Sequence, residues 1–302
     1  MPPLERGILQ SKLVSPHGLE DWNWDSEVEP KIRTTALRQM FVSTQLLALR
    51  DPRLNPIVAP VGDGYAVFHG PGAISSFARE LGTSRPITAD ELGALEQFYA
   101  DHCCPARVWV SGRAHGSLLE LLRGRGYTAS SHSLIWCRPL EGDPLPCEHR
   151  GIQVLPVGAD LYNRWIQTVA AGFVEIHEPV PLPAIPASFF DLFFALGCAP
   201  DDQAFLAEKD GDFVGGAVLN VADGIAMLRT ASTRFAHRNA GVQQALLVAR
   251  LRYAQERDAR IAVSQTPASG PSAHNLKKLG FQPFRIGCMM EKSTQPPGSQ
   301  PR

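Results

Sequence analysis

Paired cysteines, long apolar runs and an excess of one charge are all missing from this sequence of 302 residues. Its six cysteines include no Cys-x-x-Cys pair and no His/Cys spacing that closes on zinc, so we expect reduced thiols and no metal. No stretch approaches the roughly 18 apolar residues of a membrane helix, and the N-terminal segment lacks the apolar core of a secretory signal. We therefore expect a cytoplasmic protein that does not engage a membrane.

The charge balance also excludes a class of partner. The chain has 29 basic and 30 acidic residues, so no overall field attracts nucleic acid. The segment DWNWD places Trp22 and Trp24 among acidic neighbours, which favours packing over base stacking. Nucleophile-elbow, kinase and His-Glu-x-x-His motifs are missing as well. We expect a small ligand that is bound locally, and no nucleic acid.

The remaining composition fits a globular protein of two domains. Hydrophobic residues make up 44% of the chain, enough for a buried core. The proline-bearing segment RPLEGDPLPCEHR, Arg138–Arg150, disfavours both helix and sheet and reads as a linker. The predicted domains are therefore residues 1–143 and 144–292. Residues 293–302 have almost nothing to bury and are expected to form a disordered tail.

Each half of the chain ends in the same order of predicted elements. A strand is followed by a helix that stops at a Gly-aromatic pair, and a second strand follows. This repetition indicates an internal duplication. The paired elements are strands 106–111 and 260–264, helices 116–127 and 272–281, and strands 131–138 and 284–292.

The second half begins with further predicted elements. A first strand at 152–157 precedes a helix that Asp160 can cap and that runs to about Phe173. After a proline-rich loop and a short apolar helix, two apolar runs joined by Lys209–Asp212 predict a β-hairpin. The strand IAMLRTAST then leads into the segment RFAHRNAGVQQALL.

The segment RFAHRNAGVQQALL, Arg234–Leu247, joins this strand to an amphipathic helix. Apolar residues recur at helical spacing from Gly241, so the helix starts near Asn239–Gly241. Arg250 and Arg257 fall on its polar face. The first free amides and the positive end of the helix dipole point into the preceding loop, which suits a pyrophosphate. Arg234 and Arg238 would add positive charge there.

This ordered set resembles the GNAT family of acyl-CoA N-acyltransferases, whose pyrophosphate loop reads Arg/Gln-x-x-Gly-x-Gly/Ala. The resemblance covers about residues 151–292. Arg238–Gln243 occupy the six loop positions, and Gln243 stands where the family has a small residue. The sequence looks most like a bacterial tandem subfamily with a degenerate first half. The resemblance implies an α/β protein of two GNAT-like domains in tandem, each a mixed, mostly antiparallel twisted sheet flanked by helices.

The resemblance also implies acetyl-CoA as cosubstrate, without metal, in the second half only. The strand 226–233 would splay from the strand 260–264, with the pantetheine in the gap. In the first half, Gly62–Gly72 includes a GDG hairpin turn and no counterpart of the pyrophosphate loop. The implied cofactor-binding residues are Arg234, Arg238, Asn239, Ala240, Gly241, Val242, Gln243, Gln244 and Asn275.

The implied function is an N-acetyltransferase that moves an acetyl group from acetyl-CoA to an amine of a small molecule, peptide or protein. Backbone amides near Ser232 and Thr233 would hold the thioester carbonyl. Glu175, His177 and Glu178 are candidate bases, and a chain of water molecules is an equal alternative.

One departure from the family leaves a second function open. Leu276 stands where the family has a thiolate-protonating tyrosine. The alternative is a non-catalytic acyl-CoA-binding or protein-interaction scaffold. The missing tyrosine favours the scaffold, whereas the intact Arg238–Gly241 loop favours the enzyme. The sequence allows either a monomer or a homodimer.

Overall fold

The computed structural model describes residues 27–141, 145, 151–175 and 177–292. The chain forms two compact units. Of the described residues, the N-terminal unit contains 52–134 and 285–292, and the C-terminal unit contains 27–51 and 135–284. These units differ from a division at residue 143, because each includes residues from both halves of the sequence. The expected tail and most of the expected linker lie outside the described residues.

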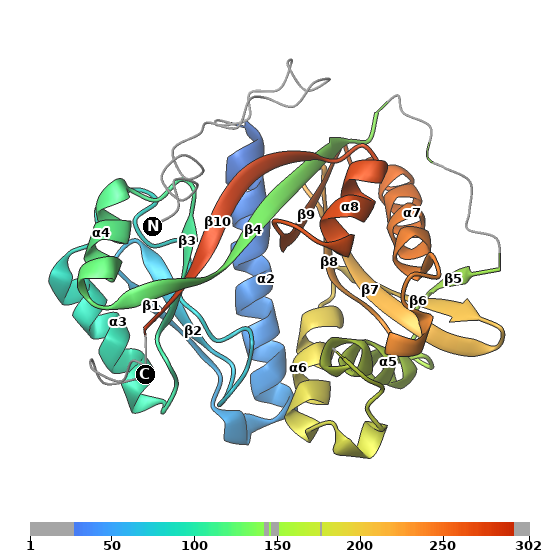
Figure 1. The fold of residues 1–302 in the computed structure, drawn as a ribbon, viewed down its shortest axis with the longest axis horizontal. Coiled ribbons are helices and arrows are strands. Elements are labelled where there is room, and N and C mark those ends of the chain that lie inside the picture. The colour runs from blue at the N-terminus through green and yellow to red at the C-terminus, as the bar shows by residue number, and fades with distance from the viewer. Residues whose placement is uncertain (1–26, 142–144, 146–150, 176, 293–302) are drawn as a thin grey trace, which may run out of the picture. The chain divides into compact units, whose positions relative to one another are not determined.

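The C-terminal unit is a mixed sheet flanked by helices (Figure 1). Its strand order is β4-β9-β8-β7-β6-β5, with β8 and β9 parallel and β5 to β8 antiparallel. The strands are β5 (Gln153–Pro156), β6 (Asp202–Lys209), β7 (Asp212–Ala222), β8 (Ile225–Thr233), β9 (Ile261–Pro267) and the end of β4 (Tyr127–Pro139). The helices are α2 (Glu29–Arg50), α5 (Tyr162–Val174), α6 (Ala187–Gly197), α7 (Val242–Gln255) and α8 (Pro271–Lys278).

Local sequence signals explain several of these elements. The β6–β7 hairpin turns at Asp210 and Gly211, whose φ values of 54° and 86° suit a type I′ turn. Helix α5 begins without the expected Asp160 cap, because its N-cap residue is Leu161 and no side chain caps it. The helix is instead held by its apolar face, where Trp165 and Val169 are fully buried.

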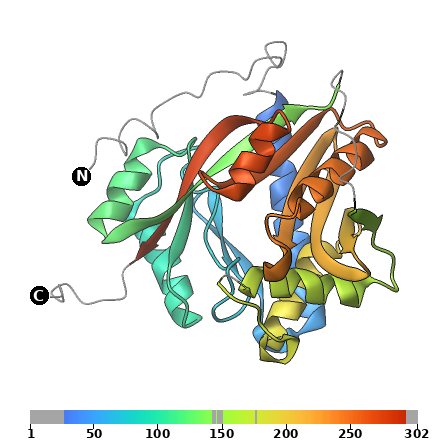
Figure 2. The ribbon, with the colours of Figure 1, turned by 45° about the vertical axis from the view of Figure 1, so that its right-hand side comes forward.

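Helices α5 and α7 cover opposite faces of β7 (Figures 1 and 2). A methyl group on Gly215 would lie 2.8 Å from Val242 of α7, whereas one on Gly216 would lie 2.7 Å from Val169 of α5. Successive strand residues point to opposite faces of a sheet, so two adjacent glycines let a helix approach on each side. The strand β7 is thus buried at the centre of the unit.

The N-terminal unit has its own apolar core. Its sheet residues follow the order β3-β10-β4, and a separate hairpin pairs β1 with β2. Thr88 and Glu91 form a capping box at the start of α3, which the sequence analysis did not predict. The elements are β1 (Ile57–Val61), β2 (Gly64–Phe68), α3 (Ala89–Asp101), β3 (Arg107–Ser111), α4 (Gly116–Gly124), the start of β4 and most of β10 (Gln282–Lys292).

The order of elements that the sequence predicts for the end of each half is present in the structure. The order strand, helix, strand is found as β3-α4-β4 and as β9-α8-β10. The last strand of each set contributes residues to both units, since β4 divides after Leu134 and β10 after Phe284. The α/β class and the mixed sheet with flanking helices are as predicted.

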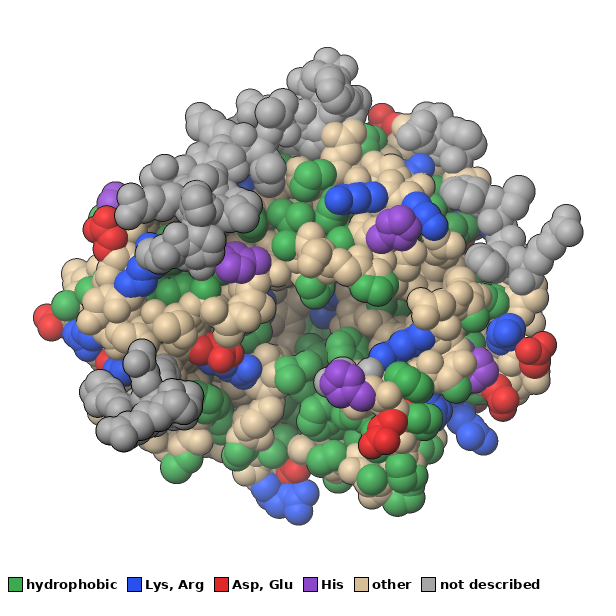
Figure 3. All heavy atoms as spheres, in the orientation of Figure 1, with side chains coloured by type: hydrophobic (Ala, Val, Ile, Leu, Met, Phe, Trp, Pro, Cys, Tyr) green, Lys and Arg blue, Asp and Glu red, His purple; other side chains and the backbone are tan. Residues whose placement is uncertain are grey.

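The surface repeats the charge balance of the sequence. On the face seen in Figure 3, basic and acidic side chains are interspersed among polar and apolar ones. In the part of the chain that the structure describes, no helix is both long and apolar enough to cross a membrane.

Candidate functional site

A pocket of about 680 Å³ lies at the start of α7 in the C-terminal unit. It is bounded by the end of α5, the end of β8, the loop before α7 and the start of α8. Most of the predicted cofactor-binding residues meet here, namely Arg238, Asn239, Gly241, Val242, Gln243, Gln244 and Asn275, together with Ser232 and Thr233.

The loop before α7 turns through two left-handed residues. Asn239 has a φ of 60° and Gly241, the N-cap residue, has a φ of 83°. No side chain caps α7, so its first amides are not used by a capping group. An uncapped helix start preceded by left-handed residues offers several N–H groups to one anion. The loop therefore has the backbone geometry that the sequence predicts for a phosphate site.

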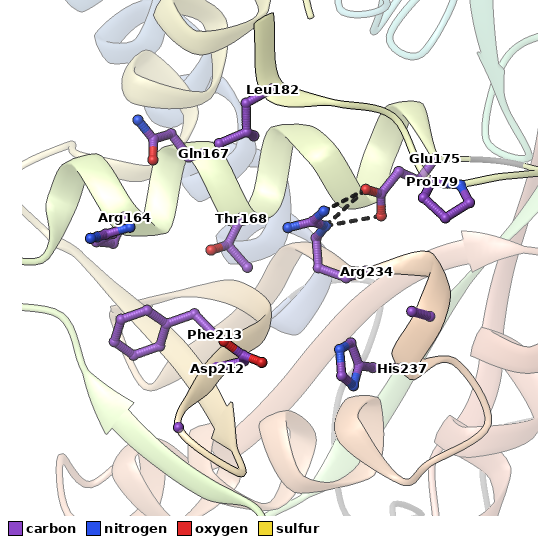
Figure 4. A pocket seen from close by; sticks show the side chains of 12 residues that line it. Arg164, Gln167, Thr168, Glu175, Pro179, Leu182, Asp212, Phe213, Arg234 and His237 are labelled. Atoms are coloured by element: carbon purple, nitrogen blue, oxygen red, sulfur yellow. Dashed lines mark hydrogen bonds and ion pairs between the residues drawn. The ribbon is translucent and has the colours of Figure 1, made fainter. Parts of the chain in front are cut away.

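The two arginines of this loop contact protein groups. Arg234 forms an ion pair of 2.7 Å with Glu175, and Figure 4 shows its guanidinium pointing toward that carboxylate. Arg238 donates to the backbone oxygens of Glu175 and, at 3.3 Å, Gly172. Both contacts tie the loop to the C-terminal end of α5, where exposed carbonyls attract positive charge. The side chains expected to bring charge to a ligand thus anchor the loop.

Glu175 is buried and serves this anchor. Its carboxylate also accepts from the amides of Phe235 at 2.8 Å and Val180 at 3.4 Å. Burial by itself would raise the pKa of Glu175, but the hydrogen bonds from Arg234 and these amides outweigh it and hold the pKa below its usual value. An ionised, fully partnered carboxylate is a weak candidate for a base.

The other two candidate bases lie on the surface. His177 and Glu178 are both exposed, in the loop that follows α5. Neither is among the residues that line the pocket at the start of α7. The structure thus separates the three candidates into one structural carboxylate and two solvated side chains.

Strands β8 and β9 separate beside the pocket. They pair in parallel only as far as Leu228 opposite Ser264. Beyond that point β8 continues to Thr233 and β9 continues to Pro267. The splay that the family resemblance implies is therefore present, and it opens toward the residues that line the pocket.

A β-bulge interrupts β8 at the same place. Residues Gly216–Val218 of β7 face the longer segment Arg229–Ser232 of β8, so the register shifts there. Thr230, one of the two residues that face Ala217, has a φ of 48°, which is rare for a β-branched side chain. Bulges leave a residue outside the ladder and recur next to active sites. This bulge lies where the two strands part.

A side-chain network joins α7 to α8 across the pocket. Gln243 donates to the hydroxyl of Ser272 at 3.1 Å and accepts from the amide of Asn275 at 2.7 Å. Gln243, which departs from the small residue of the family, thus fixes the start of α8. Leu276, which replaces the family's tyrosine, is 1% exposed and belongs to the core.

Sequence reasoning missed several lining residues. His274 and Lys278 lie on the same face of α8 as Asn275. The spacing of 271, 274, 275 and 278 is that of one helix face and would have revealed them. His237 lines this pocket and also a second one, of about 570 Å³, between α5 and the β6–β7 turn. Figure 4 shows this second pocket with Arg164 and Asp212 at its edge.

In the N-terminal unit, two carboxylates bind amides of the loop that precedes α3. Asp63 accepts from the amides of Gly82 at 2.6 Å and Ser84 at 2.7 Å, in the loop that precedes α3. Glu91 accepts from the amide of Thr88 at 2.9 Å and completes the capping box. These three amides are thus already bound to carboxylates of the chain itself.

Comparison with known proteins agrees with this geometry. Residues 170–281 match the sequence profile of the Acetyltransferase (GNAT) family. The match is to this segment, about a third of the chain. The match contains the loop before α7, the bulge and the strands that splay. Acyl transfer from an acyl-CoA is the chemistry that a GNAT domain implies. None of the curated proteins matches the chain.

Three solved structures have a fold similar to that of this chain. A GCN5-related N-acetyltransferase from Kribbella flavida is 18% identical with a TM-score of 0.57, covering 86% of this chain and 96% of its own. One from Sphaerobacter thermophilus is 16% identical with a TM-score of 0.55, covering 68% and 67%. A tandem GNAT protein from the clavulanic acid biosynthesis pathway is 15% identical with a TM-score of 0.55, covering 79% and 80%.

No group of three or more His, Cys, Asp or Glu residues is placed to hold a metal ion, within the residues that the structure describes.

Proposed function

We propose that this protein is an N-acetyltransferase that moves an acetyl group from acetyl-CoA to an amine of a small molecule, peptide or protein. The observation that carries the proposal is the uncapped start of α7, which opens into a pocket beside a splayed, bulged strand. A pyrophosphate suits the first amides and a pantetheine arm suits the gap between β8 and β9. Each of these features lies within the segment that matches the GNAT family.

The loop residues divide into two roles in this proposal. The amides of Asn239–Gln244 bind the pyrophosphate, with the left-handed Asn239 and Gly241 setting their direction. Arg234 holds the loop against α5, whereas Arg238 holds it there and also lines the pocket. Lys278 supplies positive charge on the other side of the pocket, where His274 also lies.

The transfer step needs little more than alignment. The amine nitrogen attacks the thioester carbon, the C–N bond forms, and the C–S bond breaks with its electron pair leaving on sulfur. Backbone amides of β8, between the bulge and Thr233, hold the carbonyl oxygen as negative charge develops on it. The ammonium proton passes to water, because His177 and Glu178 are exposed and do not line the pocket. Because Leu276 is buried and apolar, the thiolate takes its proton from water.

The N-terminal unit, on this proposal, is a degenerate copy that binds no acyl-CoA. Asp63 binds amides of the loop before α3 and Glu91 binds the amide of the N-cap residue Thr88, so a phosphate there would meet negative charge. The chain is then expected to bind one acyl-CoA.

An acyl-transfer screen tests the function. The full chain is incubated with acetyl-, propionyl- and succinyl-CoA against a panel of amines, peptides and proteins. Released CoA is measured by chromatography with mass detection, since the exposed Cys103 would react with a thiol reagent. We expect amine-dependent CoA release with acetyl-CoA, abolished in Gly241→Asp. Binding of acetyl-CoA without release for any amine would favour the scaffold alternative. No binding would contradict both.

A further inference from the structure

Arg250 is a buried cation in the C-terminal unit. The sequence places it on the polar face of α7, yet it is 1% exposed. Its Nε donates to Leu246 O at 3.0 Å, and its Nη1 reaches Val218 O at 3.2 Å and Arg229 O at 3.4 Å. Burial lowers the pKa of Arg250 to about 9, so the guanidinium stays protonated at neutral pH. Burying a cation whose partners are carbonyl groups costs free energy, which indicates a functional role for Arg250.

The carbonyls that Arg250 binds flank the bulge. Val218 and Arg229 are the last pair of the β7–β8 ladder before the register shifts. A bulge disrupts this ladder and leaves carbonyls that need another donor. The Arg229 carbonyl also shares its peptide unit with the amide of Thr230. A charged donor on that oxygen polarises the unit and strengthens its N–H as a donor.

A second side chain holds the bulge from the opposite face. Ala217, the single residue of β7 that faces the bulge, accepts from the indole Nε1 of Trp165 at 3.3 Å. Trp165 is fully buried on α5, whereas Arg250 comes from α7 on the other face of the sheet. The bulge is therefore fixed between one donor from each helix.

We propose that Arg250 is a positioning residue for acyl transfer. It fixes the bulge so that the amides of Thr230 and Ala231 are aimed into the gap between β8 and β9, where the thioester carbonyl lies. This inference rests on the proposed function. Amides that are fixed before the reaction stabilise developing negative charge without reorganising, and Arg250 supplies that order from behind the strand.

The test reads the thioester carbonyl directly and needs no acceptor. Acetyl-CoA labelled with ¹³C at the carbonyl is bound to the full chain, and its C=O stretch is compared with that of free acetyl-CoA by isotope-edited infrared spectroscopy. The variants are Arg250→Lys, which keeps the charge but not the planar guanidinium with its several donors, and Arg250→Met. Trp165→Phe removes the donor on the other face. Leu251→Ala, which truncates a fully buried neighbour on α7, controls for lost stability.

We expect the stretch to move to lower frequency on binding to the wild type and to Leu251→Ala. It should return most of the way to the free value in Arg250→Met and part of the way in Arg250→Lys and Trp165→Phe, with acetyl-CoA affinity within about threefold. Once an amine is known, kcat should fall about 10-fold to 100-fold in Arg250→Met with little change in KM.

Three outcomes are distinguishable from these. A full wild-type shift in both folded Arg250 variants would overturn the positioning role. If Arg250→Met does not fold, Arg250→Lys and Trp165→Phe decide in the same way. Binding without any shift in the wild type would overturn the inference while leaving acyl-CoA binding intact, whereas no binding by the folded wild type would contradict the proposed function itself.

Discussion

The guanidinium of Arg234 lies 2.7 Å from the carboxylate of Glu175, where the Glu175 side chain is 1% exposed and that of Arg234 is 31% exposed. Because the two side chains differ in burial, removing Arg234 should cost more stability than removing Glu175. Without Arg234 a carboxylate stays buried with only backbone donors, whereas without Glu175 the guanidinium can turn to water. The pair joins the pyrophosphate loop to α5, and it removes Glu175 from the candidate bases.

Arg234→Met should therefore destabilise the protein by about 3 kcal/mol, and Glu175→Gln by about 1 kcal/mol. The folded-state pKa of Glu175 lies below its usual value, so its stabilisation is present above the usual carboxyl pKa and is lost as pH falls through the folded pKa. Without Arg234 the pKa of Glu175 rises. The difference in unfolding free energy between wild type and Arg234→Met, measured by urea unfolding, should then narrow as pH falls through the raised pKa of Glu175 in the variant. Equal losses for both variants at pH 7 would contradict this reading.

Gly241→Ala should weaken acetyl-CoA binding at least tenfold, because a side chain disfavours the left-handed φ of 83° that aims the loop amides. Gly126, after α4, has the same φ of 83° and does not line the pocket. Both alanine variants should lose about 1–2 kcal/mol of stability, but only Gly241→Ala should change affinity in calorimetry. A comparable loss of affinity in Gly126→Ala would show that the loss reflects general backbone strain and not the geometry of the pyrophosphate loop.

Gly172→Ala should destabilise the protein, whereas Gly93→Ala should stabilise it. A methyl group on Gly172 of α5 would meet the Ser232 side chain at 2.6 Å, so we expect a loss of about 1–3 kcal/mol and a displaced end of β8. Gly93 of α3 has open space around it, and its alanine variant should gain about 0.5–1 kcal/mol from helix propensity. Thermal unfolding of the two variants checks the signs. Stabilisation by Gly172→Ala would contradict the close approach of α5 to β8.

Asp63→Asn should destabilise the N-terminal unit by about 2 kcal/mol, since an amide places its own donors against those of Gly82 and Ser84. Burial opposes ionisation, but the donors from Ser84, Gly82 and Arg85 keep the pKa of Asp63 below its usual value. This stabilisation is thus present above the usual carboxyl pKa and is lost as pH falls through the folded pKa.

A matched control is Asp101→Asn on the exposed face of α3, which should change stability by less than about 0.5 kcal/mol. Acetyl-CoA affinity should be unchanged in both variants. Weaker acetyl-CoA binding in Asp63→Asn would place the ligand in the N-terminal unit after all.

Elements with strong local signals were predictable from the sequence. The β6–β7 hairpin follows from Asp210 and Gly211, and the start of α7 follows from its apolar spacing and Gly241. Helix α2 gave no such signal. Its buried positions include Thr35 and Gln39, so no apolar stripe marks it, and it packs with α6 of the C-terminal unit.

The partners of the site's charged residues could not be predicted from local sequence patterns. Glu175 lies 59 residues before Arg234, so no short motif could show that the arginine is committed to it. Arg250 falls on the polar face of α7 by periodicity, yet the bulge supplies carbonyls that bind it in the core. Such pairs depend on how strands and helices pack, which helical periodicity in the sequence does not indicate.

Calorimetric titration of the full chain with acetyl-CoA tests the proposed acyl-CoA binding at the start of α7 most directly. The structure predicts one molecule bound per chain, with affinity lost in folded Gly241→Asp and kept in Asp63→Asn. The absence of binding by the folded wild type, or binding that Gly241→Asp leaves unchanged, would contradict the assignment of the pocket at the start of α7.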